Sequence, residues 1–365
     1  MASRIGRLVD LLQLTPAEPV NAGLAGDWRA LAAEPAVLPL IRREGAALWL
    51  HRRLRFLGIG GESALEEALR VQAHHEVVRG LRIDDEAAAS LRLLQDAGIP
   101  VALIKGQARR AATSLYPWAD ARALSDVDLL VPGPAGRPAW EVLRAAGYEL
   151  AVDPKRSYDE HFHLPPISGT RRVAVEIHTS TSPVLPPDEA WRRATDDADH
   201  LTWADLSVIV PSATELLWHA IDHAFAHGDP TRLRSFLDGA VILAAGRPID
   251  WDRIVHRLDA LEVWEANSRA TVPRRTQLVW LATAAMFAAV ELPAVVQARP
   301  LPVRRLLRWR QLVLGANFPD EVEERLFDEG NRTELVAPLA ESFPGTRLWR
   351  RLRHVVASFL ARGGY

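Results

Sequence analysis

Residues 101–131 read VALIKGQARRAATSLYPWADARALSDVDLLV, and here the pattern of the chain changes from helical periodicity to short apolar strands. It begins with a short apolar run that ends in a glycine turn, VALIKG (101–106), and it closes with DVDLLV (126–131). Short apolar runs bounded by Gly and Pro are typical of buried strands. We expect a helix between them, at 107–115. The stretch therefore predicts the first part of a β-sheet.

The flanking sequence has a different period. Upstream, apolar residues recur every three to four positions over 26–98, which predicts helices, with one stretch at 36–57 and a longer one at 63–95. The longer helix is expected to end at AGIP (97–100), since Gly and Pro end helices. From residue 212 onward the helical period returns and persists nearly to the end.

Between these helical segments the sequence predicts more strands. They are YELAV (148–152), VAVEIH (173–178) and LSVIV (206–210), with a helix at 137–146. We therefore predict an α+β fold, with a small mixed sheet of four to six strands flanked by N-terminal and C-terminal helical segments. The expected domains are an N-terminal helical segment (1–98), the α/β core (99–211) and a C-terminal helical domain (212–365).

Composition excludes several classes of protein. The 365 residues include no cysteine, which rules out disulfides, zinc–thiolate sites and a cysteine nucleophile. The N-terminus lacks the apolar core of a secretory signal, and the longest apolar run (278–290) is shorter than the ~20 residues that span a bilayer. A cytoplasmic protein with a buried helix at this run is expected.

Net charge gives no general drive toward nucleic acid, because it is only −2. Arginines do cluster with apolar residues at 304–310 and 347–353. Each cluster is either a solvated helix face or a surface for an acidic peptide, RNA or another subunit. Nucleic acid is not the favoured partner.

Two strands carry the candidate chemistry. Side chains two residues apart on a strand share a face, so Asp126 and Asp128 project together, and Glu176 and His178 do the same on the strand at 173–178. Adjacent carboxylates repel unless a cation lies between them, and such oxygen ligands suit Mg²⁺. If the strands are neighbours, Glu176 completes a three-carboxylate cup. We expect these carboxylates roughly 4–6 Å apart, with a raised pKa for at least one.

A family resemblance follows from the order of short motifs. Residues 91–131 contain AGIP, IKG, LYP, an arginine and DVDLLV, and the series continues with HFHLPP (161–166), VAVEIH (173–178) and RLRSFLDGAVIL (232–243). Over residues 35–245 the chain resembles the uncharacterised bacterial nucleotidyltransferases of the DNA polymerase β-like superfamily. The resemblance implies a nucleotidyltransferase core.

The resemblance also implies roles for single residues. Asp126, Asp128 and Glu176 correspond to the catalytic metal ligands. The candidates for binding the nucleotide are Lys105 and Gly106, which stand where other members have a Gly-Ser turn, together with Arg122 and Ser125. His163 and His178 are expected at the rim, where they would touch substrate. Lys105 has a further argument, because Lys105 and Lys155 are the chain's two lysines and a compact ammonium suits a phosphate.

The leading hypothesis is transfer of a nucleoside monophosphate from a nucleoside triphosphate, by default ATP, to a hydroxyl acceptor with Mg²⁺ or Mn²⁺. The acceptor is a small molecule, a natural-product intermediate, a peptide or protein, or an RNA. One alternative is a metal hydrolase that uses His161, His163, Glu176 and His178. Another is a non-catalytic binding protein on the same fold. Separately, His219, His223 and His227 lie on one helical face, either as a packed interface or as metal ligands.

Overall fold

The computed structural model describes residues 11–12, 22–32, 37–61, 63–116, 118–151, 162–182, 184–226, 232–260, 262–265, 270–272 and 274–298. These residues divide into two compact units. The first, which we call the helical unit, is drawn from Met1–Gln72, Ile221–Ala244 and Trp251–Tyr365. The second, the sheet unit, is drawn from Ala73–Ala220 and Ala245–Asp250. The arginine clusters at 304–310 and 347–353 lie outside the described residues.

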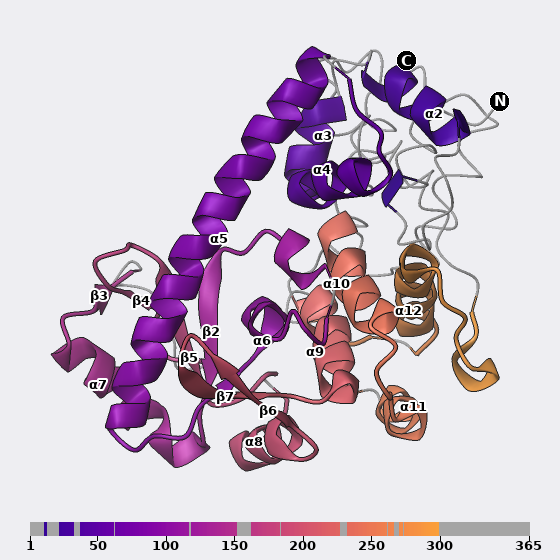
Figure 1. Ribbon diagram of the computed structural model, residues 1–365. Coiled ribbons are helices and arrows are strands. Elements are labelled where there is room, and N and C mark those ends of the chain that lie inside the picture. The colour runs from indigo at the N-terminus through magenta and orange to yellow at the C-terminus, as the bar shows by residue number, and fades with distance from the viewer. Residues whose placement is uncertain are drawn as a thin grey trace, which may run out of the picture. The chain divides into compact units, whose positions relative to one another are not determined.

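A mixed seven-stranded sheet forms the centre of the sheet unit (Figure 1). Its order is β3-β4-β5-β2-β1-β7-β6, with β2 parallel to β5, β1 parallel to β7 and the remaining pairs antiparallel. The strands are β1 (Ala102–Leu103), β2 (Asp126–Leu130), β3 (Glu149–Leu150), β4 (Ile167–Ser168), β5 (Ala174–His178), β6 (Asp199–Trp203) and β7 (Leu206–Val210).

The sheet confirms the α+β class and differs from the prediction in two strands. The segments expected at 101–106, 126–131 and 173–178 lie in one sheet, but the sheet has seven strands rather than four to six. The sequence did not indicate β4, which has only two residues, or β6, whose residues DHLTW are alternately half-buried and exposed. Neither strand has the apolar run on which the prediction relied.

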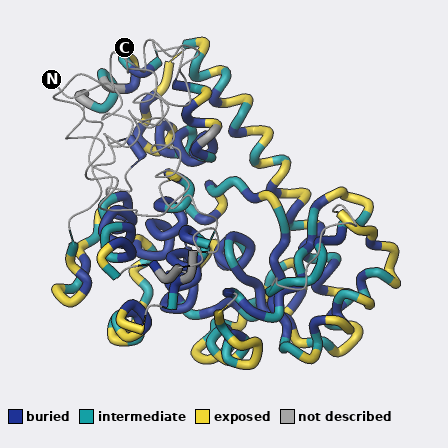
Figure 2. Tube along the Cα trace, turned by 180° about the vertical axis from the view of Figure 1, so that it is seen from behind, coloured by how far each residue is buried: buried dark blue, intermediate teal, exposed yellow. Residues whose placement is uncertain are grey.

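Three short helices pack against strands of the sheet. Helix α6 (Lys105–Ala111) contacts β1 and β2, α7 (Gly136–Ala145) contacts β5, and α8 (Pro187–Thr195) contacts β7. The sheet unit also contains most of α5 (Ala64–Asp96), the beginning of α9 (Ala213–Ala226) and two 3₁₀ turns, η1 (Ala119–Ala121) and η2 (Gly133–Ala135). Figure 2 shows the central strands as buried.

One face of the central strands is wholly apolar. Val127 and Leu129 of β2 and Val175 and Ile177 of β5 are each 0% exposed. Burying such side chains stabilises a fold by about 1.5–3 kcal/mol each. The polar residues of both strands must therefore project from the opposite face.

The helical unit contains the remaining helices. They are α2 (Ala22–Ala32), α3 (Val37–Glu44), α4 (Ala47–Phe56), the first part of α5, the end of α9, α10 (Leu233–Ala244), α11 (Trp251–Asp259) and α12 (Arg274–Ala288), with η3 (Ala294–Val296) and the two-stranded β8 (Trp264–Glu265) and β9 (Ala270–Thr271). The single stretch expected at 36–57 is two helices. Gly45 has φ of +65° after α3, a left-handed conformation that ends a helix.

Helices α10 and α12 pack closely through a glycine. A Cβ at Gly239 would lie 2.8 Å from both Ala284 Cβ and Trp280 Cη2, so a larger residue does not fit without movement. The apolar run at 278–290 falls largely in α12 and is buried there, as expected, with Trp280, Leu281 and Phe287 each 0% exposed. In the part of the chain that the structure describes, every helix is too short or too polar to cross a bilayer.

Candidate active site

The register of β2 and β5 brings the predicted carboxylates together. The strands are parallel, with Asp128 opposite Glu176, Asp126 opposite Ala174 and Leu130 opposite His178. Because side chains alternate along a strand, Asp126, Asp128, Glu176 and His178 all project from the face opposite the apolar one. The two segments are therefore neighbours, as the three-carboxylate cup requires.

Lys105 lies within this carboxylate cluster. It follows β1, and its Nζ is 2.5 Å from Asp128 Oδ1 and 3.9 Å from Glu176 Oε2. Burial alone would lower the pKa of Lys105, but the charges of Asp128 and Glu176 raise it above its ordinary value. Lys105 also has φ of +53°, a left-handed conformation that is uncommon for a residue with a side chain.

His178 contacts the same two carboxylates. Its Nε2 lies 2.9 Å from Asp128 Oδ1 and 3.3 Å from Glu176 Oε2, and its side chain is 0% exposed. Both neighbours are acceptors, so Nε2 carries the proton in this arrangement. The sequence placed His178 at the rim as a substrate contact, whereas the structure places it beside the predicted metal ligands.

Three of these side chains form a group that could hold a metal ion. One ligand atom from each of Asp128, Glu176 and His178 lies within 4.8 Å of the other two. Two carboxylates and an imidazole fit Mn²⁺ or another transition metal as well as Mg²⁺. Asp126 is outside this closest group, but burial and the charges of Asp128 and Glu176 raise its pKa.

The electrostatics distinguish the two aspartates. Burial raises the pKa of Asp126, and the nearby charge of Asp128 raises it further. Burial acts on Asp128 too, but Lys105 and His178 outweigh it and hold the pKa of Asp128 well below its usual range. Burial is likewise outweighed at Glu176, where His178 and Lys105 lower the pKa. A raised pKa at one carboxylate agrees with the expectation from the sequence.

Gly106 and Arg122 lie against each other beside Lys105. A Cβ at Gly106 would be 2.4 Å from Arg122 Nη1 and 2.5 Å from Leu124 Cδ2, so the glycine makes room for the guanidinium. The Nη1 atom also donates to the Ala123 carbonyl oxygen over 3.3 Å. Ser125 is exposed, and its hydroxyl donates to Asp126 Oδ1 over 2.9 Å. The four candidate nucleotide-binding residues thus border the carboxylates.

The other histidines are placed differently. His163 pairs with His178 in an antiparallel bridge, their ring centroids are 5.1 Å apart, and its Nδ1 lies 2.9 Å from the Leu164 carbonyl oxygen. Burial and His178 lower the pKa of His163. Burial lowers the pKa of His219 to about 3, with Lys105 and His178 adding to the effect. His161 and His227 lie outside the described residues.

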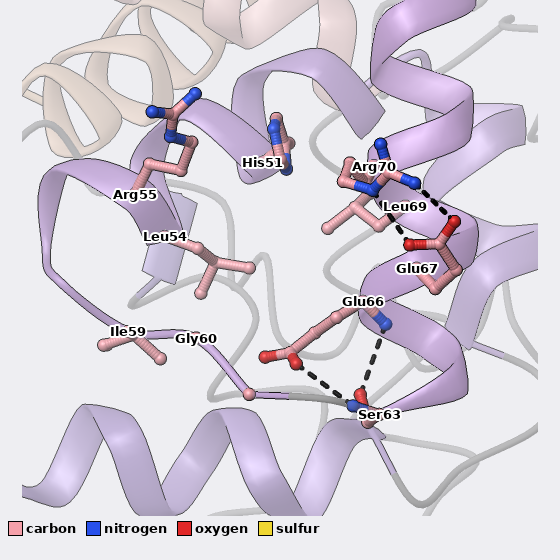
Figure 3. A pocket seen from close by; sticks show the side chains of 11 residues that line it. His51, Leu54, Arg55, Ile59, Gly60, Ser63, Glu66, Glu67, Leu69 and Arg70 are labelled. Carbon is pink, nitrogen blue, oxygen red and sulfur yellow. Dashed lines mark hydrogen bonds and ion pairs between the residues drawn. The ribbon is translucent and has the colours of Figure 1, made fainter.

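The helical unit contains a separate cavity of about 370 Å³ (Figure 3). Its two carboxylates already have partners. Glu66 accepts hydrogen bonds from the Ser63 backbone N–H and from Trp28 Nε1, and Glu67 forms an ion pair with Arg70 at 2.6 Å. A divalent cation would have to break these contacts. Within the described residues, the side chains close enough together to hold a metal ion are Asp128, Glu176 and His178 on the sheet and not those of this cavity, so the sheet cluster is the better candidate for a metal centre.

Comparison with known proteins agrees with a transferase. A family model described as an uncharacterised nucleotidyltransferase matches residues 32–272, about two thirds of the chain. No curated protein and no solved structure matches the chain. The matched range includes every residue of the carboxylate cluster.

Proposed function

The chain belongs to this nucleotidyltransferase family, and we propose that it transfers a nucleoside monophosphate from a nucleoside triphosphate to a hydroxyl group of an acceptor. One observation carries the proposal. The parallel register of β2 and β5 sets Asp128 opposite Glu176, next to Asp126, with the buried Lys105 ammonium among them. Membership of the DNA polymerase β-like superfamily is part of the same proposal.

The residues present fit a divalent cation. Asp126, Asp128 and Glu176 would hold it, with His178 close enough to be a further ligand. When bound, such an ion neutralises charge on the triphosphate and makes the acceptor hydroxyl a better nucleophile. Mg²⁺ is the default, and the imidazole of His178 makes Mn²⁺ a realistic second choice.

The remaining candidates act by binding and orientation. Lys105 and Arg122 supply positive charge for the phosphates, and Gly106 leaves space for Arg122. The Ser125 hydroxyl orients Asp126. His163 lies beside His178, where it would border the acceptor. In-line phosphoryl chemistry depends mainly on such positioning and charge stabilisation.

Transfer is testable without knowing the acceptor. The protein would be incubated with Mg²⁺ or Mn²⁺, with each α-³²P-labelled triphosphate and with fractions of a cell lysate. We expect label to move to an acceptor with release of pyrophosphate, and ATP is the first triphosphate to try. The Asp128→Asn variant, assayed in parallel, should give no labelled product. Release of pyrophosphate at equal rates from both proteins would contradict the proposal.

A second function is favoured by one feature, the proximity of His178 to the two carboxylates. A site of Asp128, Glu176 and His178 could activate water in a metal hydrolase. His163, part of the ligand set expected for that function, is outside this group. Metal analysis separates the two functions, since zinc or iron that survives dialysis favours the hydrolase and loosely held Mg²⁺ or Mn²⁺ favours the transferase.

A further inference from the structure

The Lys105 ammonium occupies the position where a cation would be expected. It lies 2.5 Å from Asp128 and 3.9 Å from Glu176, and these carboxylates belong to the group that could hold a metal. Its side chain is 14% exposed, and those of Asp128 and Glu176 are 5% and 19% exposed. A metal ion and this ammonium would therefore compete for the same oxygens.

In the part of the chain that the structure describes, the Lys105 ammonium has one protein partner at hydrogen-bond distance. An ammonium has three N–H donors, yet within the described residues Lys105 makes one hydrogen bond, to Asp128. The left-handed backbone of Lys105, with φ of +53°, adds strain to this arrangement.

The charge balance points the same way. Three carboxylates, those of Asp126, Asp128 and Glu176, share one lysine ammonium, that of Lys105, so two negative charges remain when all four groups are ionised. A divalent cation would balance them. Once it is present, the ammonium is repelled at close range and needs another anion. Arg122, packed against Gly106, marks the adjacent region as positive and suited to phosphates.

We propose that Lys105 is an exchangeable counter-ion, which neutralises Asp128 and Glu176 in the empty site and moves to the triphosphate when metal and nucleotide arrive together. The inference rests on the proposed function for its second half, since the triphosphate is the second partner of Lys105. Its consequence is that metal binds weakly alone and that metal and nucleotide favour each other's binding.

Metal binding without nucleotide tests the first half. Free Mn²⁺ would be titrated by electron paramagnetic resonance into the wild type, Lys105→Met and Lys105→Arg. Lys105→Met removes the charge and keeps the length, and we expect it to bind Mn²⁺ at least tenfold more tightly than the wild type. At an effective dielectric constant of about 20, one charge about 4 Å away changes binding by more than that. Lys105→Arg keeps the charge and should bind as weakly as the wild type.

A matched control is available on the surface of the sheet unit. Arg137 pairs with Glu141 at 2.7 Å, and both side chains are more than half exposed. Arg137→Met also converts a cation to Met and should leave Mn²⁺ binding unchanged. If Lys105→Met binds Mn²⁺ no more tightly than the wild type, Lys105 does not compete with the metal and the inference is wrong.

The movement of Lys105 can be followed in the wild type, because the chain has two lysines. With [ε-¹³C]lysine, the spectrum contains two lysine signals, and the Lys155→Arg variant identifies that of Lys105. We expect a large shift when Mg²⁺ and a non-hydrolysable triphosphate are added together, and a small shift with either alone. This measurement decides the question even if Lys105→Met fails to fold.

The two proposals fail in different ways. Tighter Mn²⁺ binding by Lys105→Met, with no binding of any triphosphate, would support the competition with metal and contradict both the exchange and the transferase function. Triphosphate binding by calorimetry with no change in the Lys105 signal would contradict the exchange alone.

Discussion

Asn substitutions at Asp126 and Asp128 should both lower kcat strongly but should change stability in different directions. Asp128 is 4% exposed and accepts hydrogen bonds from Lys105 and His178, at 2.5 and 2.9 Å. Removing one partner of a buried ion pair costs about 3–5 kcal/mol, because the other charge stays buried. Lys105 keeps Glu176 at 3.9 Å, so we expect a loss near the lower end, about 3 kcal/mol, for Asp128→Asn.

Asp126→Asn should have the opposite tendency. The pKa of Asp126 is raised by burial and by the charge of Asp128, which means that ionising Asp126 opposes folding. Replacing its charge with a neutral amide should therefore leave the free energy of unfolding unchanged or increase it. From the sequence alone, relief of repulsion is expected at both aspartates. The contacts of Lys105 and His178 reverse that expectation at Asp128.

Urea unfolding of the wild type and both variants measures these differences. The pKa of Asp128 is lowered, so its contribution is present above its unfolded value of about 3.9 and is lost as pH falls. The pKa of Lys105 is raised, so its contribution is present below about 10.4 and is lost at higher pH. The gap between the wild type and Asp128→Asn should thus shrink as pH falls below about 4 and as pH rises above about 10.

Turnover is measured on the same preparations. Loss of either ligand should lower kcat by roughly two to three orders of magnitude, since each ~1.4 kcal/mol of lost stabilisation is tenfold. The control is Glu141→Gln, which breaks an exposed pair and should cost less than about 1 kcal/mol. Wild-type turnover by folded Asp128→Asn would refute the transferase mechanism. An Asp128→Asn variant as stable as the wild type would refute the electrostatic reasoning.

Three more substitutions test other parts of the site. Lys105→Ala should raise KM for the triphosphate with little change in kcat, if the contact between Lys105 and the triphosphate is equally strong in the ground and transition states. Steady-state kinetics at varied triphosphate concentration measures KM and kcat. Gly106→Ala places a Cβ 2.4 Å from Arg122 Nη1 and 2.5 Å from Leu124 Cδ2, so it should displace the guanidinium and lower kcat/KM about tenfold or more, and the melting temperature should fall as well because Leu124 is buried. The wild type should lose stability as pH falls from about 6.5 toward 3, because His219 is protonated in the unfolded chain but not in the folded chain, where burial lowers the pKa of His219 to about 3. Urea unfolding at pH 7 and pH 5 should show a smaller loss of unfolding free energy for His219→Phe than for the wild type.

Period-two alternation was sufficient to find the polar face. DVDLLV and VAVEIH each place two polar side chains on one side of a pleated strand, whatever the rest of the fold does. Alternation does not say which strands are neighbours. The parallel pairing of β2 with β5 joins segments more than 40 residues apart, and the register that sets Asp128 opposite Glu176 depends on tertiary packing.

The contacts that Lys105 and His178 make could not be predicted from the sequence either. Lysine and histidine can each contact several kinds of group, and the sequence assigned Lys105 to the nucleotide phosphates and His178 to the substrate. The structure shows both beside Asp128, which is a consequence of how β1 and β5 flank β2. The roles proposed for the individual site residues, and the domain boundaries after residues 98 and 211, stay predictions.

The burial of Lys105 has a practical consequence for chemical labelling. Amine reagents attack the unprotonated amine, and the raised pKa of Lys105 together with its contact to Asp128 keeps this amine protonated and shielded at neutral pH. It is the only lysine among the described residues, so the described surface offers such reagents no lysine target. Acylation of Lys105, followed by mass spectrometry, would then report how often the carboxylate cluster releases it, and a reagent normally used to map surfaces becomes a probe of this one buried site.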